Sequence, residues 1–279
     1  MLNNNLSVSD AIDFGNRTLS DVNIDNYKNE VVWFLSDIIN CSNNELKLNQ
    51  SLLLSDKQLD LFKSYLCERI DGKPFQYILG YADFYGRDFV VNQNTLIPRP
   101  ETEIIINHLS KIKNKKSMLE IGTGTGCISI TAALETKIDR IVSTDISEGA
   151  LSIAIENAKK YKINKINFIN HNFLKDSIKQ KFDVIVSNPP YINMHEFKHL
   201  DRHIIDYEPK LALTDNNDGL TFYRKFESIA NKIMHKKTTM LLEFGGINQL
   251  SGVEKIFRNY NIKIHLDLQG DPRIIQINL

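Results

Sequence analysis

The sequence predicts an α/β protein: a parallel β-sheet with helices on both faces, preceded by a small N-terminal helical bundle and a β-hairpin. Three observations predict this fold. Apolar residues recur at helical spacing in the first part of the chain. From residue 118 onward, short apolar strands alternate with helices, which is the order of a parallel sheet covered on both faces. The 279 residues, 42% of them hydrophobic, suffice to bury such a core.

Residues 1–80 are expected to form a helical domain. Apolar side chains at helical spacing predict one helix, with the stripe Val31, Val32, Phe34, Leu35, Ile38 and Ile39. A second helix begins at Ser55, because Gln58 completes a capping box, and it ends before Gly72 and Pro74. No catalytic motif falls in this stretch, so a small bundle is the simplest interpretation.

Residues 81–99 are expected to form a β-hairpin linker. Phe84 and Phe89 stand on the two sides of the turn residues Gly86 and Arg87. The segment 98–103 then opens a helix that runs to Leu109, because Pro100 suits a first helical turn and two following acids complement the helix dipole.

Residues 100–279 are expected to form the sheet domain. The predicted strands are 118–121, 140–143, 166–169, 184–186 and 240–243, followed by two strands at 263–266 and 273–279. The predicted helices are 127–134, 148–160 and 222–234.

The composition excludes several classes of protein. Lys and Arg number 34 against 34 Asp and Glu, so the chain lacks the charge excess of a protein that holds nucleic acid mainly by neutralising phosphates. High apolar content with low net charge excludes disorder. No apolar run approaches the ~20 residues of a membrane span, and the first residues lack the pattern of a signal peptide.

The three cysteines, Cys41, Cys67 and Cys127, are scattered. They form no C-x-x-C pair and join no histidines at the spacing of metal ligands, so we expect no metal. An odd, scattered set is typical of reduced thiols in a cytoplasmic protein.

A glycine-rich loop, Glu120-Ile-Gly122-Thr123-Gly124-Thr125-Gly126, stands between a predicted strand and a predicted helix. Glycines let the backbone turn sharply and approach a ligand, and the helix offers its N-terminal N–H groups. The spacing is not that of the dinucleotide fingerprint, because Cys127 takes the last glycine position. A structural turn is the alternative interpretation.

Asp145 ends the next predicted strand. A carboxylate at the carboxyl end of a second strand lies where a nucleotide ribose binds in open sheets, and it can accept hydrogen bonds from both sugar hydroxyls. The alternative is that Asp145 merely caps the helix that begins near Ser147.

The segment Asn188-Pro189-Pro190-Tyr191 follows a fourth apolar strand. Two prolines fix the backbone and end the strand, so the Asn188 side chain is held at the edge of the sheet where ligands bind. A polar side chain there predicts a pocket, whereas an ordinary proline-containing loop is the alternative.

Together these motifs resemble those of Rossmann-like methyltransferases that use S-adenosylmethionine and act on planar, amide-like nitrogens. The resemblance implies that the Asn188 side-chain oxygen and a backbone carbonyl near Pro189 accept hydrogen bonds from the substrate nitrogen, while Tyr191 packs on its planar group. Asn188, Pro189 and Tyr191 would be catalytic, and Asn188, Pro189, Pro190 and Tyr191 would bind the substrate. The implied cofactor-binding residues are Gly122, Thr123, Gly124, Thr125, Gly126, Asp145, Phe173 and Asn188.

Flanking segments resemble, in order, those of the family that methylates the glutamine N5 of peptide-chain release factors. They are 72–80, 84–86, 96–103, 207–213, 218–223 and 242–249. In particular, Pro100-Glu101-Thr102-Glu103 favours this family over a sister family that modifies a ribosomal protein. A DNA adenine or RNA guanine methyltransferase is a further alternative, as is a binding module without activity.

The resemblance implies a release factor's Gly-Gly-Gln loop as the substrate, S-adenosylhomocysteine as the second product, and partner recognition by residues 1–80. We expect a monomer that depends on neither nucleic acid nor membrane. Two residues depart from the family pattern: Asn172 replaces an Asp, which puts its contact with the adenine in question, and Glu120 replaces an Asp but keeps the acid. Phe173 could instead be an ordinary core aromatic. Glu243, at a strand end, is expected to be structural, with support of the pocket as the alternative.

Overall fold

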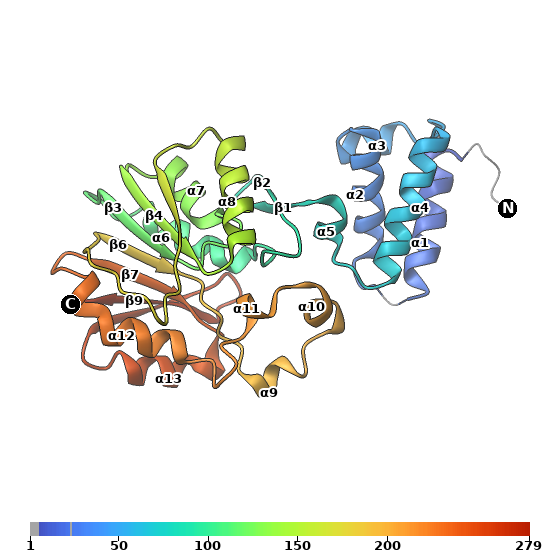
Figure 1. Cartoon of the computed structure of the whole chain (residues 1–279). Helices are drawn as coiled ribbons and strands as arrows, with labels where there is room; N and C mark the ends of the chain where they lie inside the picture. The colour runs from blue at the N-terminus through green and yellow to red at the C-terminus, as the bar shows by residue number, and fades with distance from the viewer. Residues whose placement is uncertain (1–5, 23) are drawn as a thin grey trace. The chain divides into compact units, whose positions relative to one another are not determined.

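The computed structural model describes residues 6–22 and 24–279 (Figure 1). The chain divides into two compact units, the first ending at Gly80 and the second beginning at Tyr81. The hairpin is part of the second unit. The predicted boundary between a linker and the sheet domain at residues 99 and 100 stays a prediction.

The first unit is helical. Its helices are α1 (Val8–Ser20), α2 (Tyr27–Ile39), α3 (Asn43–Leu48), α4 (Asp56–Ile70) and α5 (Phe75–Leu79). The capping box at Ser55 is confirmed, because the Gln58 backbone N–H donates to the Ser55 hydroxyl while the Ser55 N–H donates to the Gln58 side chain. Ser7 and Ser42 begin α1 and α3 in the same way.

Helix α1, which no apolar stripe predicted, packs closely on its neighbours. Gly15 lies at the contact, where an added Cβ would stand 2.8 Å from the Phe62 ring and 2.9 Å from a Val31 methyl group. Gly15 lies in the buried stripe with Val8, Ala11 and Leu19, and its lack of a side chain permits this close packing although glycine lowers helix propensity. The partly buried Arg69–Glu30 ion pair, at 2.7 Å, joins α4 to α2.

The second unit contains the sheet, with strand order β5-β4-β3-β6-β7-β9-β8. The first five in this order run parallel, and β9 pairs antiparallel with both β7 and β8. The strands are β3 (Ser117–Ile121), β4 (Arg140–Asp145), β5 (Ile166–Asn170), β6 (Val184–Ser187), β7 (Thr239–Glu243), β8 (Asn261–Leu266) and β9 (Pro272–Asn278). The predicted α/β class and parallel sheet are confirmed.

The hairpin pairs β1 (Tyr81–Phe84) with β2 (Arg87–Val90). Its turn is one residue earlier than predicted, because Arg87 pairs with Phe84 inside the ladder. Tyr85 and Gly86 therefore make the turn, both with positive φ, which is the backbone that a two-residue hairpin turn of type I′ requires.

Helices cover both faces of the sheet (Figure 1). One face carries α6 (Glu103–Leu109, preceded by the 3₁₀ turn η1, Pro100–Thr102), α7 (Cys127–Glu135) and α8 (Glu148–Lys160), and the other carries α12 (Thr221–Ile233) and α13 (Ile247–Ile256). Successive strand residues alternate between the two cores: Val184 and Val186 pack on the first face, Ile185 on the second. Three short helices, α9 (Met194–Phe197), α10 (Arg202–Tyr207) and α11 (Lys210–Leu213), follow β6.

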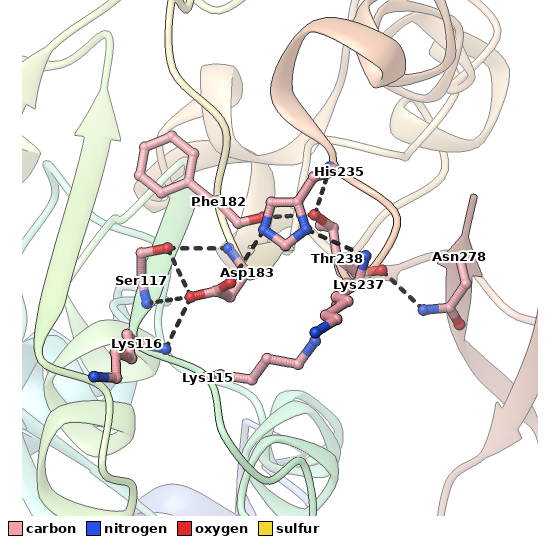
Figure 2. Close-up of polar contacts among 9 residues, drawn as sticks. All are labelled: Lys115, Lys116, Ser117, Phe182, Asp183, His235, Lys237, Thr238 and Asn278. Atoms are coloured by element: carbon pink, nitrogen blue, oxygen red, sulfur yellow. Dashed lines mark hydrogen bonds and ion pairs between the residues drawn. The ribbon is translucent and has the colours of Figure 1, made fainter.

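A polar cluster joins the starts of β3, β6 and β7 at the edge opposite the predicted site (Figure 2). One carboxylate oxygen of Asp183 accepts hydrogen bonds from the Lys116 and Ser117 N–H groups, and the other faces His235 Nε2 at 3.1 Å. Burial alone would raise the pKa of Asp183, but these hydrogen bonds outweigh it and hold the pKa below its ordinary value. The cluster stabilises the sheet and lies away from the chemistry.

Replacing Asp183 with alanine should therefore destabilise the fold by about 2–3 kcal/mol, because two backbone N–H groups lose a charged acceptor. The pKa is lowered, so the stabilisation is complete above about pH 4 and is lost in stronger acid. Urea denaturation at pH 7 and pH 3 measures the difference. Asp139→Ala, at an exposed position nearby, is the control; an equal effect of the two substitutions at pH 7 would contradict the role of the cluster.

Candidate active site

The glycine loop joins β3 to α7 in the left-handed backbone that its glycines permit. Gly122, Gly124 and Gly126 have φ values of 75°, 55° and 79°. A Cβ on Gly126 would stand 3.0 Å from Ile130 and 3.2 Å from the Cβ of Ala154, so this glycine lets α7 pack closely on α8. Gly124 faces open space instead. The first part of the loop thus presents backbone without side chains at Gly122 and Gly124.

Asp145 ends β4 beside this loop, as predicted. One carboxylate oxygen accepts a hydrogen bond from the Gly124 N–H, and the other accepts one from the Ser147 N–H, both at 2.9 Å. Ser147, not Asp145, is the N-cap of α8, since its hydroxyl accepts from the Ala150 N–H. The alternative capping interpretation of Asp145 is therefore wrong. Burial raises the pKa of Asp145, and the N–H donors partly oppose that rise.

Asn188 follows β6 directly, and its amide is fixed by a hydrogen bond. Its Nδ2 donates to the Thr102 hydroxyl oxygen at 3.1 Å, and Thr102 in turn donates to the Glu243 carboxylate at 2.7 Å. Among the residues that the structure describes, none donates a hydrogen bond to Asn188 Oδ1. The backbone oxygen of Asn188 lies 3.9 Å from where a Cβ of Gly122 would stand, so the two motifs are adjacent.

A cavity of about 350 Å³ opens between these motifs, within the range of a small-molecule site. Most of the predicted site residues line it: Gly122, Thr123, Gly124, Thr125, Asp145, Phe173, Asn188, Pro189 and Pro190. Phe173 is 4% exposed and packs on Phe226 of α12, with ring centroids 4.4 Å apart. It is thus both a core aromatic and part of the cavity wall.

Gly126 and Tyr191 lie outside the lining of this cavity. The Tyr191 ring packs against the turn after β7, 3.2 Å from where a Cβ of Gly245 would stand, and its hydroxyl donates to Glu243 at 3.5 Å. Burial raises the pKa of Tyr191 far above its ordinary value, so the phenol stays neutral.

A side-chain clamp holds the backbone of Tyr191. The Gln249 side-chain NH₂ donates to the carbonyl oxygens of Tyr191 and Gly219, both at 3.0 Å, and its oxygen accepts from the Gly245 N–H. Gly219 leaves no room for a side chain, since a Cβ there would stand 2.2 Å from the Tyr191 carbonyl oxygen. The segments 218–223 and 242–249 that carried the resemblance thus support the Asn188–Tyr191 loop.

Glu208, inside the resembling segment 207–213, and Asn157 are buried polar residues near the cavity to which the sequence assigned no role. The Glu208 carboxylate accepts from the Ile97 N–H at 3.1 Å and pairs with Arg99, which fixes part of the cavity wall. The Asn157 side chain exchanges two hydrogen bonds with the Val90 backbone and donates a third to the Thr125 carbonyl. Asn157 therefore ties β2 of the hairpin to the glycine loop.

Asn172, where the family pattern has an Asp, uses its side chain locally. Its Oδ1 accepts hydrogen bonds from the N–H groups of Leu174 and Lys175 and so shapes the turn after β5. The residue lines the cavity, but its oxygen is already engaged. Nothing among residues 6–22 and 24–279 gathers three His, Cys, Asp or Glu side chains as a metal ion would need. Within the same residues, every helix is too short or too polar to cross a membrane.

Glu120 is the buried acid before the glycine loop. One oxygen accepts from the Thr123 and Ser143 hydroxyls, both at 2.7 Å, while Oε1 has no partner among the described residues. Burial raises the pKa of Glu120 to about 7, even though these hydroxyl donors lower it. The folded protein is therefore more stable when the Glu120 carboxyl is protonated.

Glu120→Gln should stabilise the protein at alkaline pH relative to the wild type, by about 1–3 kcal/mol. A raised folded-state pKa means that the stabilisation by Glu120 is complete below its unfolded pKa and is lost as the pH rises through about 7. Glutamine keeps the acceptor oxygen and remains neutral. Melting temperatures at pH 5.5 and 8.5 test this, with Glu156→Gln at an exposed position as the control. A gain in melting temperature from Glu120→Gln that is no larger at pH 8.5 than at pH 5.5 would contradict the prediction.

Two family models match this chain. The model of the methyltransferase small domain matches residues 100–251, and that of the PrmC N-terminal domain matches residues 10–80. A methyltransferase structure from Pyrococcus furiosus has the same fold, with a TM-score of 0.54 and 17% identity over 70% of this chain and 90% of its own. The fold and the site define a methyltransferase of the Rossmann-like class.

Curated relatives identify the family. A release factor glutamine methyltransferase of Flavobacterium psychrophilum is 38% identical, covering 84% of this chain and 85% of the relative. One from Bacillus cereus is 33% identical, covering 97% and 98%. A bifunctional methyltransferase of Rickettsia bellii is 33% identical, and the match covers 98% of this chain but 55% of the relative. The chain belongs to the release factor glutamine methyltransferase family.

Proposed function

We propose that this protein transfers a methyl group from S-adenosylmethionine to the side-chain nitrogen N5 of the glutamine in the Gly-Gly-Gln loop of peptide-chain release factors. The observation that carries the proposal is the position of Asn188, with an unengaged amide oxygen, beside the glycine loop and Asp145 in one cavity. The printed names of the relatives supply the substrate class.

The residues around the cavity fit this cofactor. Gly124 leaves open space where any side chain would intrude, so a ligand can approach the loop backbone. Each Asp145 oxygen has one N–H donor, and a carboxylate has further lone pairs for ribose hydroxyls. Phe173 offers an apolar wall for an adenine ring.

When bound, S-adenosylmethionine supplies an electrophilic methyl group on a positively charged sulfur. The task left to the protein is to orient a weak nucleophile, because the lone pair of an amide nitrogen is delocalised. Asn188 Oδ1 accepts one N–H of the substrate amide, and a carbonyl of the rigid Asn188–Pro189 segment accepts the other. The prolines hold these acceptors in place, so they need no reorganisation during the reaction.

Incubation with methyl-labelled S-adenosylmethionine and a bacterial release factor tests the proposal. We expect label in the wild-type factor and none in a factor whose Gly-Gly-Gln glutamine is replaced by alanine. Label that persists in the alanine factor would refute the substrate assignment. Ribosomal protein and nucleic acid serve as alternative acceptors, and labelling of either in place of the release factor would point to the competing functions.

We propose further that the helical unit, residues 1–80, recognises the release factor. It carries well-exposed leucines of the kind that a protein partner covers, among them Leu48 at 84% and Leu53 at 57% exposure. Leu48→Asp should raise the KM for intact release factor without changing turnover of a short Gly-Gly-Gln peptide. An unchanged KM would speak against this role for that surface.

A further inference from the structure

We propose that Thr102 and Glu243 are positioning residues that set the orientation of the Asn188 side-chain amide, so that its oxygen and not its NH₂ faces the substrate. This inference rests on the proposed function, because the orientation of the Asn188 amide matters only if that amide binds the substrate. It assigns a role to Thr102 of the Pro98–Glu103 segment, and for Glu243 it favours support of the pocket over a structural role alone.

The three side chains form a directed chain of hydrogen bonds. Asn188 Nδ2 donates to Thr102 Oγ1 at 3.1 Å, and Thr102 Oγ1 donates to Glu243 Oε2 at 2.7 Å. Thr102 is 3% exposed and Glu243 is 1% exposed, so water does not compete for these contacts. The groups come from η1, the end of β6 and the end of β7, which only the folded sheet brings together.

The number of protons that each group can donate fixes the direction of these hydrogen bonds. An ionised carboxylate can only accept, and a hydroxyl has a single proton. Once the Thr102 proton is committed to Glu243, the Thr102 oxygen can only accept, and Asn188 must present its NH₂ to it. The Asn188 oxygen is then left for the cavity. A flipped amide would place an N–H against the N–H of the substrate, which is repulsive.

Glu243 itself is held from two further directions. Its second oxygen accepts from the Tyr191 hydroxyl at 3.5 Å, and its backbone carbonyl accepts from the Tyr223 hydroxyl at 2.6 Å. Tyr191 therefore acts on the reaction from outside the cavity, by holding the carboxylate that orients the Asn188 amide. This gives Tyr191 a role although it does not line the cavity.

The protonation state of Glu243 should control which way the hydrogen bonds between Asn188, Thr102 and Glu243 run. Burial raises the pKa of Glu243 to about 7, while the Thr102 hydrogen bond lowers it. A protonated carboxyl can donate to Thr102 and release the hydroxyl proton toward Asn188, which favours the flipped amide. The titratable and charged groups that face Glu243 are Arg273 on β9, Glu101 on η1, Tyr191 after β6, Tyr223 on α12 and Cys127 on α7. The orienting form is the ionised one, so kcat should fall below about pH 7.

The matched pair Thr102→Val and Thr102→Ser tests the inference. Valine keeps the branched shape and removes the hydroxyl, whereas serine keeps the hydroxyl. We expect kcat to fall about 10–100-fold in Thr102→Val, to stay within about threefold of the wild type in Thr102→Ser, and the Kd for S-adenosylhomocysteine to stay unchanged in both. The fall of kcat at acidic pH should be present in the wild type and absent in Thr102→Val.

Wild-type kcat in Thr102→Val, or a parallel loss of S-adenosylhomocysteine binding, would overturn the inference, the latter by showing a merely structural role. Failure of the wild type to methylate a release factor would instead reject the proposed function. A readout without turnover separates the two. The side-chain NH₂ resonances of Asn188, identified by their loss in Asn188→Ala, should titrate with Glu243 in the wild type and not in Thr102→Val; identical titration in both would also overturn the inference.

Discussion

Asn188→Ala is expected to lower kcat for methyl transfer by about 10²–10³-fold while the fold persists. The substitution removes the side-chain acceptor that we assign to the substrate amide, and it leaves Thr102 without its Asn188 donor. Asn188 is not fully buried, and the rigid prolines remain, so the loss should appear in turnover more than in stability.

Single-turnover methylation of a release factor measures the effect, with the melting temperature as the check on folding. Asn167→Ala, at an exposed position on β5, is the matched control and should retain wild-type turnover. If Asn188→Ala kept wild-type turnover, Asn188 would have no part in orienting the substrate.

Gly219→Ala should have the second largest effect, a loss of activity of about 10²-fold together with lower stability. An alanine Cβ would stand 2.2 Å from the Tyr191 carbonyl oxygen and 2.9 Å from the Gln249 side chain, so the Asn188–Tyr191 loop must move. A displacement of about 1 Å at a reacting group can cost about this much in rate. Gly219 also has φ of +79°, which adds about 1–2 kcal/mol of backbone strain for alanine.

Gly270→Ala separates the two causes. Gly270 has φ of +92° but nothing within 4 Å of its Cβ position, so it carries the strain without the clash. In thermal melts Gly270→Ala should show the backbone cost alone and Gly219→Ala a larger loss of stability, and kcat should fall in Gly219→Ala alone. Equal activity in the two variants would mean that the loop tolerates the displacement.

Local patterns in the sequence predicted the elements whose signals are contained within a few residues. The five parallel strands are apolar runs between helices, and they were found to within two residues at each end. Asp145 and Asn188 follow strands directly, and parallel strands bring their carboxyl ends to one edge, so their meeting in one cavity could be predicted.

Contacts between distant segments could not be predicted in this way. Helices α1 and α13 each contain a glycine at a tight contact with a distant segment, Gly15 against Phe62 and Gly252 against Leu220. The direction of the Tyr191 ring depends on Gly245 and Glu243, which lie more than fifty residues further along the chain. A motif places its backbone, but the partners of each side chain depend on the folded sheet.

The bond between Asn157 and Val90 makes one backbone amide a reporter of the site. The Val90 N–H donates to the Asn157 side chain, which also holds the Thr125 carbonyl of the glycine loop. Among the described residues, β1 is the only strand that pairs with β2. Fluctuations that loosen the loop also release this N–H to solvent. Its hydrogen exchange should therefore slow when a ligand occupies the loop, although Val90 does not line the cavity.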